Sequence, residues 1–423
     1  MTHTGDAARH DAVLIVVSSL GESSRRTFFE SVSKHYPIWL FVGGAGRPAE
    51  PSWELPFIVG HTSLDTLDAG AMIAAAAELS RQRPIAGIVS YDEARIHATA
   101  TVATALGLPT SPPEAIARCR DKHLTREALA RAQVPQARSV AVTSLAEAVR
   151  EANQIGYPVV VKPRHLAASF GVARADDDAQ LAAAYQAART TTLPEAPEYY
   201  EAGVLVEEYL DGVEYSVESV CFDGRVEPVA VTRKRTGYPP NFEEVEHLVD
   251  GASPLLRDDG LREVVIGAHR AVGFDTGVSH VEVKIGRRGP RIIEINARLA
   301  GDLIPYLGHV AGGPDLELAA AAVACGDAPD LGRGNPRVAA IRYYYPESDV
   351  TVAAVRIDET LLPPGVVRAA PLADPGQRVL LPPRGSAWES RLAQVVVVRD
   401  TEAMCTAALD AAAKAVVVTP DHP

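Results

Sequence analysis

The segment His280–Asp302, HVEVKIGRRGPRIIEINARLAGD, restricts the fold more than any other part of this chain of 423 residues. Two runs of alternating apolar and charged residues flank Gly286-Arg287-Arg288-Gly289. This period of two predicts two antiparallel strands joined by a tight turn. One face of the pair would carry only polar side chains, namely His280, Glu282, Lys284, Glu294, Asn296 and Arg298.

That polar face predicts a metal site. Glu282 and Glu294 lie directly opposite each other if the turn is a three-residue loop over Arg287–Gly289, closed by a left-handed glycine. Facing carboxylates repel, and a hard divalent cation such as Mg²⁺ removes the repulsion. Asn296 adds a neutral oxygen ligand, and Arg298 lies one strand period further on, where it can neutralise a phosphate or carboxylate. A solvated face of mixed charges is the alternative.

The first 110 residues alternate buried β-branched runs with Ala-rich helical patterns, which predicts βαβ units and a mostly parallel sheet. The predicted strands are Ala12–Val17, Ile38–Val42 and Ile85–Ser90, and the predicted helices are Glu22–Lys34, Leu67–Arg81 and Ala94–Leu106.

The pattern becomes antiparallel after Gly156. Tyr157–Pro163 and Val204–Tyr209 read as strands, and Tyr215–Phe222 with Val226–Thr232 reads as a hairpin around Asp223-Gly224. Short β-rich runs separated by Pro and Gly after about residue 335 predict a small closing subdomain. We therefore predict an α/β chain with an N-terminal parallel domain at 1–115, a central α+β domain at 116–335 with a lid at about 156–225, and a β-rich subdomain at 336–423.

Composition excludes several classes of protein. A hydrophobic content of 47% with 22% charged residues fits a globular chain with a large core. The net charge of −13 argues against a nucleic-acid partner. Four widely spaced cysteines form no CxxC pair, which favours the reducing cytoplasm over a disulfide framework. We expect no membrane span.

Two other segments suggest phosphate and nucleotide contacts. Lys162 ends an apolar strand before a small-residue loop, where backbone N–H groups of Ser169–Gly171 could close over phosphate oxygens. No GxxxxGK[ST] motif occurs, which excludes a P-loop. The strand Val204–Leu210 ends in paired acids, where an adenine could meet backbone groups, and Glu214 could accept hydrogen bonds from ribose hydroxyls.

Together these pieces resemble the ATP-grasp superfamily in order and spacing. They are Lys122 in CRDKH, the strand PVVVKP, the run VEEYLDGVE, and EINAR. The resemblance covers roughly residues 80–310 and implies the ATP-grasp architecture. Within the superfamily the chain looks most like the L-amino-acid ligases (dipeptide synthetases), because of NFEEVEHLVD and NARLAGD.

The resemblance also implies roles for single residues. ATP contacts would come from Lys122, Lys162, Ser169, Gly171, Glu207, Glu208, Tyr209, Leu210 and Glu214. Mg²⁺, or alternatively Mn²⁺, would be held by Glu282, Glu294 and Asn296. Amino-acid substrates would meet Glu93, His247, Arg298 and Gly301, with Arg298 also stabilising the acyl-phosphate and tetrahedral oxygens. The phosphate loop departs from the Gly-Ser pair of many relatives, because this chain has Ala168-Ser169-Phe170-Gly171.

The implied activity is ATP-dependent amide formation between a carboxylate, such as an amino acid, and an amine acceptor. An ATP-grasp carboxylase or formate-activating ligase is the first alternative. A nucleotide-binding regulatory protein without catalysis is the second. Related enzymes are often dimers, so the resemblance also suggests a homodimer.

Overall fold

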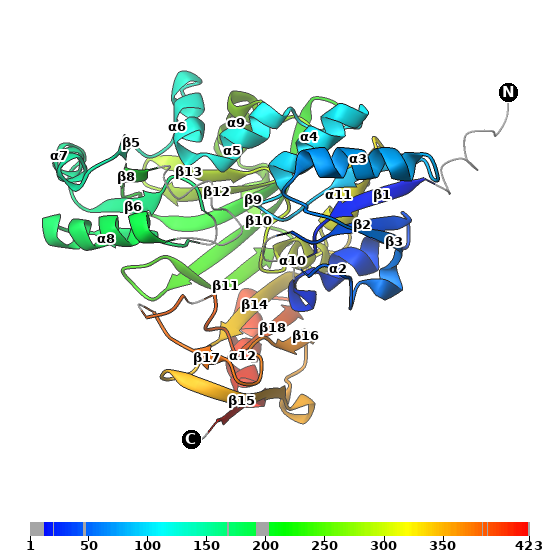
Figure 1. The fold of residues 1–423 in the computed structure, drawn as a ribbon. Coiled ribbons are helices and arrows are strands. Elements are labelled where there is room, and N and C mark those ends of the chain that lie inside the picture. Colours follow the sequence, from blue (N-terminus) through cyan, green and yellow to red (C-terminus); the bar gives the residue numbers. More distant parts are fainter. Residues whose placement is uncertain are drawn as a thin grey trace.

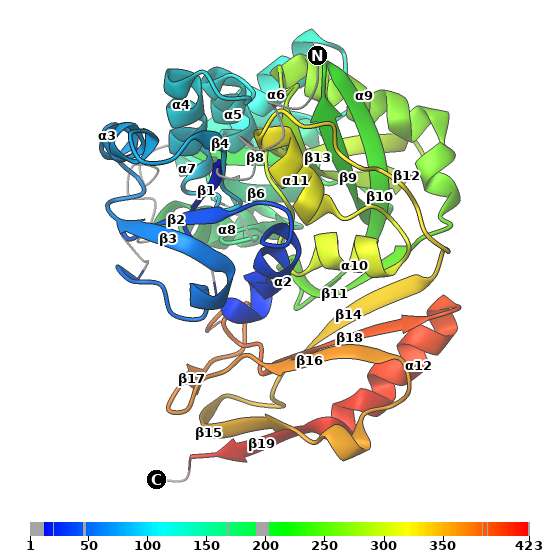
Figure 2. The ribbon, with the colours of Figure 1, turned by 90° about the vertical axis from the view of Figure 1, so that its right-hand side faces the viewer.

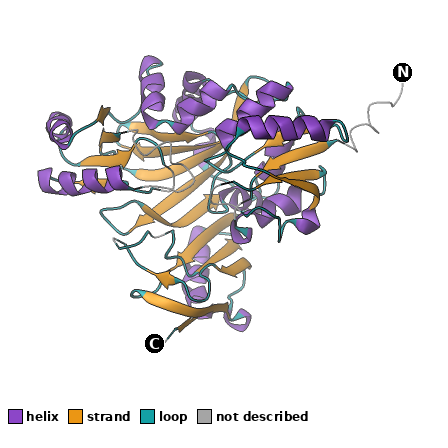
Figure 3. Cartoon of the chain, in the orientation of Figure 1, coloured by secondary structure: helices purple, strands orange, loops and turns teal. Residues whose placement is uncertain are grey.

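The computed structural model describes residues 12–19, 21–44, 48–166, 169–191, 203–382, 384–386 and 388–421. These residues form a mixed α/β molecule in which helices flank one parallel sheet and two antiparallel sheets, with a smaller sheet near the C-terminus (Figures 1 and 3). The predicted class, a parallel N-terminal sheet followed by antiparallel sheets, is confirmed.

The N-terminal sheet has the strand order β3-β2-β1-β4, and its neighbouring strands are parallel. Its elements are β1 (Val13–Val17), α2 (Glu22–Val32), β2 (Ile38–Val42), β3 (Ile58–Ser63), α3 (Ala69–Ser80), β4 (Ile85–Val89) and α4 (Ile96–Leu106). All five residues of β1 are buried, as expected for a central strand covered on both faces. Strand β3 was not predicted from the sequence, and it is an edge strand without a fully buried residue.

Helices α5 (Pro113–Arg120) and α6 (Lys122–Arg131) lead into a second sheet, which we call the lid sheet. Its antiparallel order is β5-β8-β6-β7, and Figure 1 shows it at the left with its two helices. The elements are β5 (Ser139–Val142), α7 (Leu145–Ile155), β6 (Val159–Pro163), β7 (Ala173–Ala175), α8 (Asp178–Thr190) and β8 (Val204–Glu208). Valines of β6 and β8 pack with Ala and Leu of α7 and α8 in a core of their own.

The large sheet has eight strands in the order β13-β12-β9-β10-β11-β14-β18-β16. Its strands are β9 (Val213–Phe222), β10 (Arg225–Gly237), β11 (Glu243–Asp250), β12 (Gly277–Gly286), β13 (Gly289–Asn296), β14 (Val338–Tyr344), β16 (Val366–Pro371) and β18 (Ala393–Arg399). The associated helices are α9 (Asp259–Val272), α10 (Ile304–Val310) and α11 (Leu316–Ala324). The predicted hairpin around Asp223-Gly224 is present as β9 and β10.

The C-terminal strands divide between two sheets (Figure 2). β14, β18 and β16 extend the large sheet, whereas β17 (Arg378–Val379), β15 (Val350–Ile357) and β19 (Val416–Pro420) form a three-stranded sheet. Helix α12 (Glu402–Ala412) packs on β14 and β18. Hydrogen bonds of one sheet therefore run across the predicted boundary at residue 335, and the domain division stays a prediction.

Two further observations concern the length of the helices and the state of the cysteines. Every helix of the described residues is too short or too polar to cross a bilayer. All four cysteines are free thiols, and Cys119, Cys221 and Cys405 are buried.

A buried carboxyl group links α2 to α11 and predicts a pH-dependent stability. Glu317 is 6% exposed and accepts a hydrogen bond from Thr27 Oγ1 (2.8 Å). Burial raises the pKa of Glu317 to about 8. The unfolded carboxyl ionises near pH ~4.3, so folding retains a proton between those values and stability falls as pH rises through this window.

Replacing Glu317 with Gln removes the titrating group. We expect the variant to gain stability relative to the parent as pH rises from 5 to 8, as measured by urea unfolding at several pH values. A stability difference that stays constant across this window would contradict the assigned titration.

Candidate active site

A single pocket of about 320 Å³ gathers most of the predicted site residues. Its walls come from the lid sheet, the large sheet, helices α2 and α6, the β4–α4 loop and the segment before β18. Predicted residues on these walls are Glu93, Lys122, Lys162, Ser169, Glu207, Glu208, Tyr209, Leu210, Glu214, Glu282, Glu294, Asn296, Arg298 and Gly301. Gly171 and His247 are absent from this lining.

The β12–β13 hairpin places Glu282 opposite Glu294, as the alternating pattern predicts. The predicted turn was wrong, however. Gly286 pairs with Gly289, so the turn holds two residues and not three. A register shift between Glu282 and Val283 then restores the pairing of the two glutamates. Gly289 has φ +79°, a left-handed conformation that glycine adopts readily.

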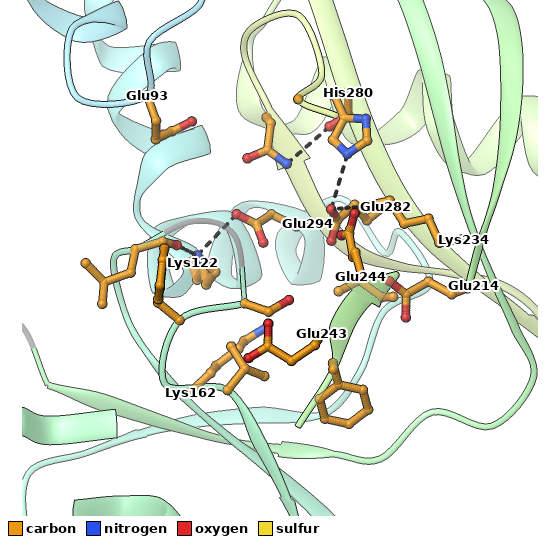
Figure 4. A pocket seen from close by; sticks show the side chains of 18 of the residues that line it. Glu93, Lys122, Lys162, Glu214, Lys234, Glu243, Glu244, His280, Glu282 and Glu294 are labelled. Atoms are coloured by element: carbon orange, nitrogen blue, oxygen red, sulfur yellow. Dashed lines mark hydrogen bonds and ion pairs between the residues drawn. The ribbon is translucent and has the colours of Figure 1, made fainter. Parts of the chain in front are cut away.

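Lys234 lies against this acidic face and was not predicted as a site residue. Its Nζ is 2.5 Å from Glu282 Oε1 and 2.7 Å from Glu244 Oε1, and the side chain is almost fully buried (Figure 4). Burial opposes the charge of Lys234, but Glu244, Glu282 and Glu214 outweigh it and raise the lysine's pKa. Lys234 therefore neutralises carboxylates that would otherwise repel one another.

His280 adds a second positive charge beside Glu282. Its Nδ1 lies 2.8 Å from Glu218 Oε1, and its Nε2 lies 3.2 Å from Glu282 Oε1. Burial lowers the pKa of His280, but Glu218 dominates and raises it to about 9. Against burial, Lys234 and His280 hold the pKa of Glu282 well below its usual range. Glu282 is therefore an anionic oxygen donor at neutral pH.

Lys122 occupies the equivalent position on the other glutamate. Its Nζ is 3.1 Å from Glu294 Oε1 and also donates to the carbonyl of Leu166 (Figure 4). Asp121 caps the N-terminus of α6 by accepting from the N–H groups of His123 and Leu124, which fixes the start of the helix that carries Lys122. The first residue of this helix, Lys122, is thus held against the face that carries Glu282 and Glu294.

Lys162 and Glu207 form a buried ion-pair cluster with Arg126, which was not predicted as a site residue. Lys162 Nζ lies 2.6 Å from Glu207 Oε2, and Arg126 Nε and Nη2 lie 2.7 and 3.0 Å from the two carboxylate oxygens. Burial opposes the charge of Glu207, but Arg126 and Lys162 overcome it and lower its pKa. One carboxylate therefore orients two cations at the pocket wall.

Replacing Glu207 with Gln should destabilise the chain strongly. Removing the central charge leaves two buried cations without their carboxylate counter-ion, which costs roughly 3 kcal/mol of unfolding free energy. Urea unfolding measures the loss, and E208Q is the matched control because Glu208 is only partly buried. A loss equal to that of E208Q would show that the buried cluster contributes little.

The end of β8 and the facing strands could hold the base and ribose of a nucleotide. Two cations lie near the ring of Tyr209, with Arg174 Cζ 4.6 Å and Lys284 Nζ 5.4 Å from the ring centre. Phe242 lies 6.4 Å away, centroid to centroid. Burial raises the pKa of Glu214 to about 7 even though Lys234 opposes the shift.

Only part of the predicted phosphate loop belongs to the described residues. Ser169 and Phe170 line the pocket, whereas Gly171 has φ +71° and its missing Cβ would meet Pro163 and Thr191 at 3.0 Å. Ala168 lies outside the described residues. The positive φ and these close contacts therefore favour a glycine at 171.

The opposite end of the pocket is built around Arg298. Its Nε lies 2.6 Å from Glu93 Oε2, and Arg120 Nε lies 3.5 Å from Glu93 Oε1. Burial opposes ionisation of Glu93, but Arg298 and Arg120 lower its pKa, so the cluster is charged. Gly301 lines the same end. The N-terminal domain therefore contributes the carboxylate that orients Arg298.

His247 is fully buried and does not line the pocket. It contacts two residues that do, Asp302 and Glu244. Its Nε2 lies 3.1 Å from Asp302 Oδ2 and 3.2 Å from Glu244 Oε2. Glu244, His247 and Asp302 have the spacing of a metal site. Arg391 already binds both oxygens of Asp302 (2.7 and 2.8 Å), and Lys234 binds Glu244. The spacing of these three groups alone does not establish a metal site, and we propose none for this cluster.

Comparison with known proteins shows which protein family and which solved structures this chain resembles. Residues 155–306 match the family model of the ATP-grasp domain, and residues 55–110 match that of the ATP-grasp N-terminal domain. The crystal structure of an L-amino acid ligase from Bacillus licheniformis superimposes with a TM-score of 0.80 at 20% identity, covering 98% of this chain and 100% of that one. Residues 155–306 thus carry an ATP-grasp domain, and the chain shares its fold with that L-amino acid ligase.

Two proteins with related sequences add to this comparison. The chain is 29% identical over 286 residues to the alanine–anticapsin ligase of Bacillus subtilis, an alignment that covers 62% of this chain and 59% of that one. The uncharacterized protein y4rH of Sinorhizobium fredii is 28% identical over 402 residues, 93% of this chain and 80% of that one. The resemblance to L-amino-acid ligases predicted from the motifs is thus confirmed.

Proposed function

We propose that this chain is an ATP-dependent carboxylate–amine ligase that joins two amino-acid-type substrates through an acyl phosphate and releases ADP and phosphate. The observation that carries the proposal is one pocket that brings Lys122 and Lys162 together with two facing glutamates and with the Arg298–Glu93 pair. The similarity to the alanine–anticapsin ligase supports amino-acid substrates.

The acidic face fits a hard divalent cation, and we propose Mg²⁺, or alternatively Mn²⁺, held by Glu282, Glu294 and Asn296. These three residues offer oxygen donors on adjacent strands and line one pocket. Each glutamate also contacts an ammonium group, Lys234 or Lys122, so a bound cation would share the two carboxylates with these lysines. When bound, the ion would neutralise phosphate charge and orient the phosphates for transfer.

Activation of the carboxylate depends on the two lysines. Lys122 and Lys162 would hold phosphate oxygens of ATP while an oxygen of the substrate carboxylate attacks the γ-phosphorus. The bond between that phosphorus and ADP breaks, and the carboxylate becomes an acyl phosphate. Glu207 and Glu294 keep the two ammonium groups in place.

Arg298 would act in the second step. The amine attacks the acyl carbon, negative charge develops on its oxygen, and phosphate leaves as the amide forms. A guanidinium held at this oxygen stabilises the charge, and Glu93 fixes its orientation through the 2.6 Å contact. The lid sheet and the segment around Ser169 would cover the pocket and exclude water, which would otherwise hydrolyse the acyl phosphate.

A phosphate-release assay with Mg-ATP across pairs of amino acids, with mass spectrometry of the products, tests the proposal. We expect a pair-dependent signal and a product with the mass of both substrates minus one water. Turnover only with bicarbonate or formate would replace it with a carboxylase-type or formate-activating reaction. ATP binding without ADP formation under any acceptor would indicate a regulatory nucleotide-binding protein.

We also propose the division at residues 115 and 335, a cytoplasmic location and a homodimer. The separate N-terminal sheet supports the boundary at 115, whereas the large sheet runs across residue 335. Four free cysteines support a reducing compartment. The homodimer rests on the resemblance alone, and sedimentation equilibrium tests it.

A further inference from the structure

Arg25 is a buried cation at the Arg298 end of the pocket. It lies in the first turn of α2, is 5% exposed, and lines the pocket. Arg25, Phe28, Phe29 and Val32 share the buried face of the helix, so the guanidinium is held on an apolar face. Burying a charge is costly unless a partner offsets it.

The described residues offer Arg25 no carboxylate partner. One hydrogen bond runs from Nη1 to the carbonyl of Ala300 (3.2 Å), and Nε has no acceptor. The guanidinium lies over the ring of Tyr91, with Cζ 4.4 Å from its centre. Burial lowers the pKa of Arg25, as expected for a cation without a close counter-ion. The guanidinium of Arg25 is therefore held in one orientation, but no carboxylate of the described residues contacts it.

The neighbouring cations are all paired. Arg298 and Arg120 share Glu93, and Arg95 Nη1 lies 2.9 Å from Asp92 Oδ2. Glu317 is close enough to act on Arg25 electrostatically. However, burial raises the pKa of Glu317 to about 8, so it is mostly protonated at neutral pH.

Arg25 differs in this respect from the other guanidinium groups at this end of the pocket. Arg298 and Arg120 contact Glu93, and Arg95 contacts Asp92, whereas Arg25 contacts no carboxylate in the described part of the chain. Arg298 is placed to meet the carboxylate that reacts. A second carboxylate can bind beside Arg25, because a planar guanidinium binds a carboxylate through two hydrogen bonds.

We propose that Arg25 is a specificity-determining residue that binds a second carboxylate of the activated substrate, remote from the reacting one. The inference rests on the proposed ligase function and names its carboxylate substrate as a dicarboxylate of the aspartate or glutamate type. Tyr91 and Ala300 orient the guanidinium of Arg25. Arg298 would then bind the carboxylate that reacts.

Matched substrates that differ only in the second carboxylate test the proposal. Ligation is measured with aspartate against asparagine, and glutamate against glutamine, as the activated substrate over a panel of amine acceptors. We expect the parent chain to prefer a dicarboxylate by at least about 10-fold in kcat/KM, and R25M to bring that ratio close to one through KM. R25K should retain part of the preference because it keeps the charge.

A binding experiment covers the case in which R25M folds poorly or the acceptor is not found. Thermal unfolding of the parent chain is followed with a non-hydrolysable Mg-ATP analogue and each of aspartate, glutamate, succinate and glutarate. We expect at least one dicarboxylate to raise the Tm more than its amide analogue does, with a smaller rise in R25K.

Equal stabilisation by acids and amides, a parent preference for the amides, or a ratio unchanged by R25M would overturn the role of Arg25. In those outcomes neutral substrates would still form amide products, and the ligase proposal would stand. If no pair yields ADP or product, the proposed function itself fails.

Discussion

Glutamine in place of Glu294 is expected to lower phosphate release by on the order of 10⁴-fold, about 5.5 kcal/mol of transition-state stabilisation. Glu294 lies opposite Glu282 and binds Lys122 at 3.1 Å, so its charge serves both the proposed metal site and a phosphate-binding lysine. Gln keeps the shape and loses the charge. Initial rates at saturating ATP, with the Mg²⁺ concentration varied, measure the effect.

Glu227 offers the matched control for this substitution. It is an exposed glutamate on β10 of the same sheet, where it contacts Arg262 and not the pocket. E227Q should therefore keep the parent rate. Near-normal ATP consumption by a folded E294Q variant would show that the metal assignment is wrong.

Replacing Arg298 with Met is expected to lower kcat for amide formation by about 10³-fold, roughly 4 kcal/mol. The guanidinium would stabilise charge that develops only during the reaction, so kcat should fall while the KM for ATP changes little. Product formation is followed by mass spectrometry beside ADP release. R298K should recover only part of the loss, because lysine lacks the planar fork that Glu93 orients.

Arg287, an exposed arginine in the β12–β13 turn, is the control for this second prediction. R287M should leave kcat unchanged. An R298M variant that raises the KM for ATP at constant kcat would move Arg298 from the reacting end to the nucleotide.

The β12–β13 hairpin shows how much of the site could be predicted from the sequence. Alternation with a period of two fixes which side chains share a face, so the pattern of residues alone groups Glu282, Glu294 and Asn296. The turn could not be fixed in the same way, because a two-residue turn with a register shift gives the same pairing as a three-residue turn. Only the backbone distinguishes them.

Residues contributed by distant elements were harder to predict. Arg126 shares a helix face with Lys122 and Leu129, and that spacing could have shown it to be buried. Nothing in the sequence shows that this face meets Glu207, because the two are brought together by tertiary packing. Lys234 stands between two other cations, Arg233 and Arg235, and only the sheet order shows that it alone turns toward Glu282.

The central claim is that a carboxylate is activated by phosphorylation before an amine attacks it. The most direct measurement uses a substrate whose carboxylate oxygens are both ¹⁸O, with Mg-ATP and an amine acceptor, followed by mass spectrometry of the phosphate and the product. The proposed reaction predicts one ¹⁸O atom in the released phosphate and one in the amide carbonyl. Phosphate without ¹⁸O, alongside ADP, would contradict the acyl phosphate and with it the proposed ligase mechanism.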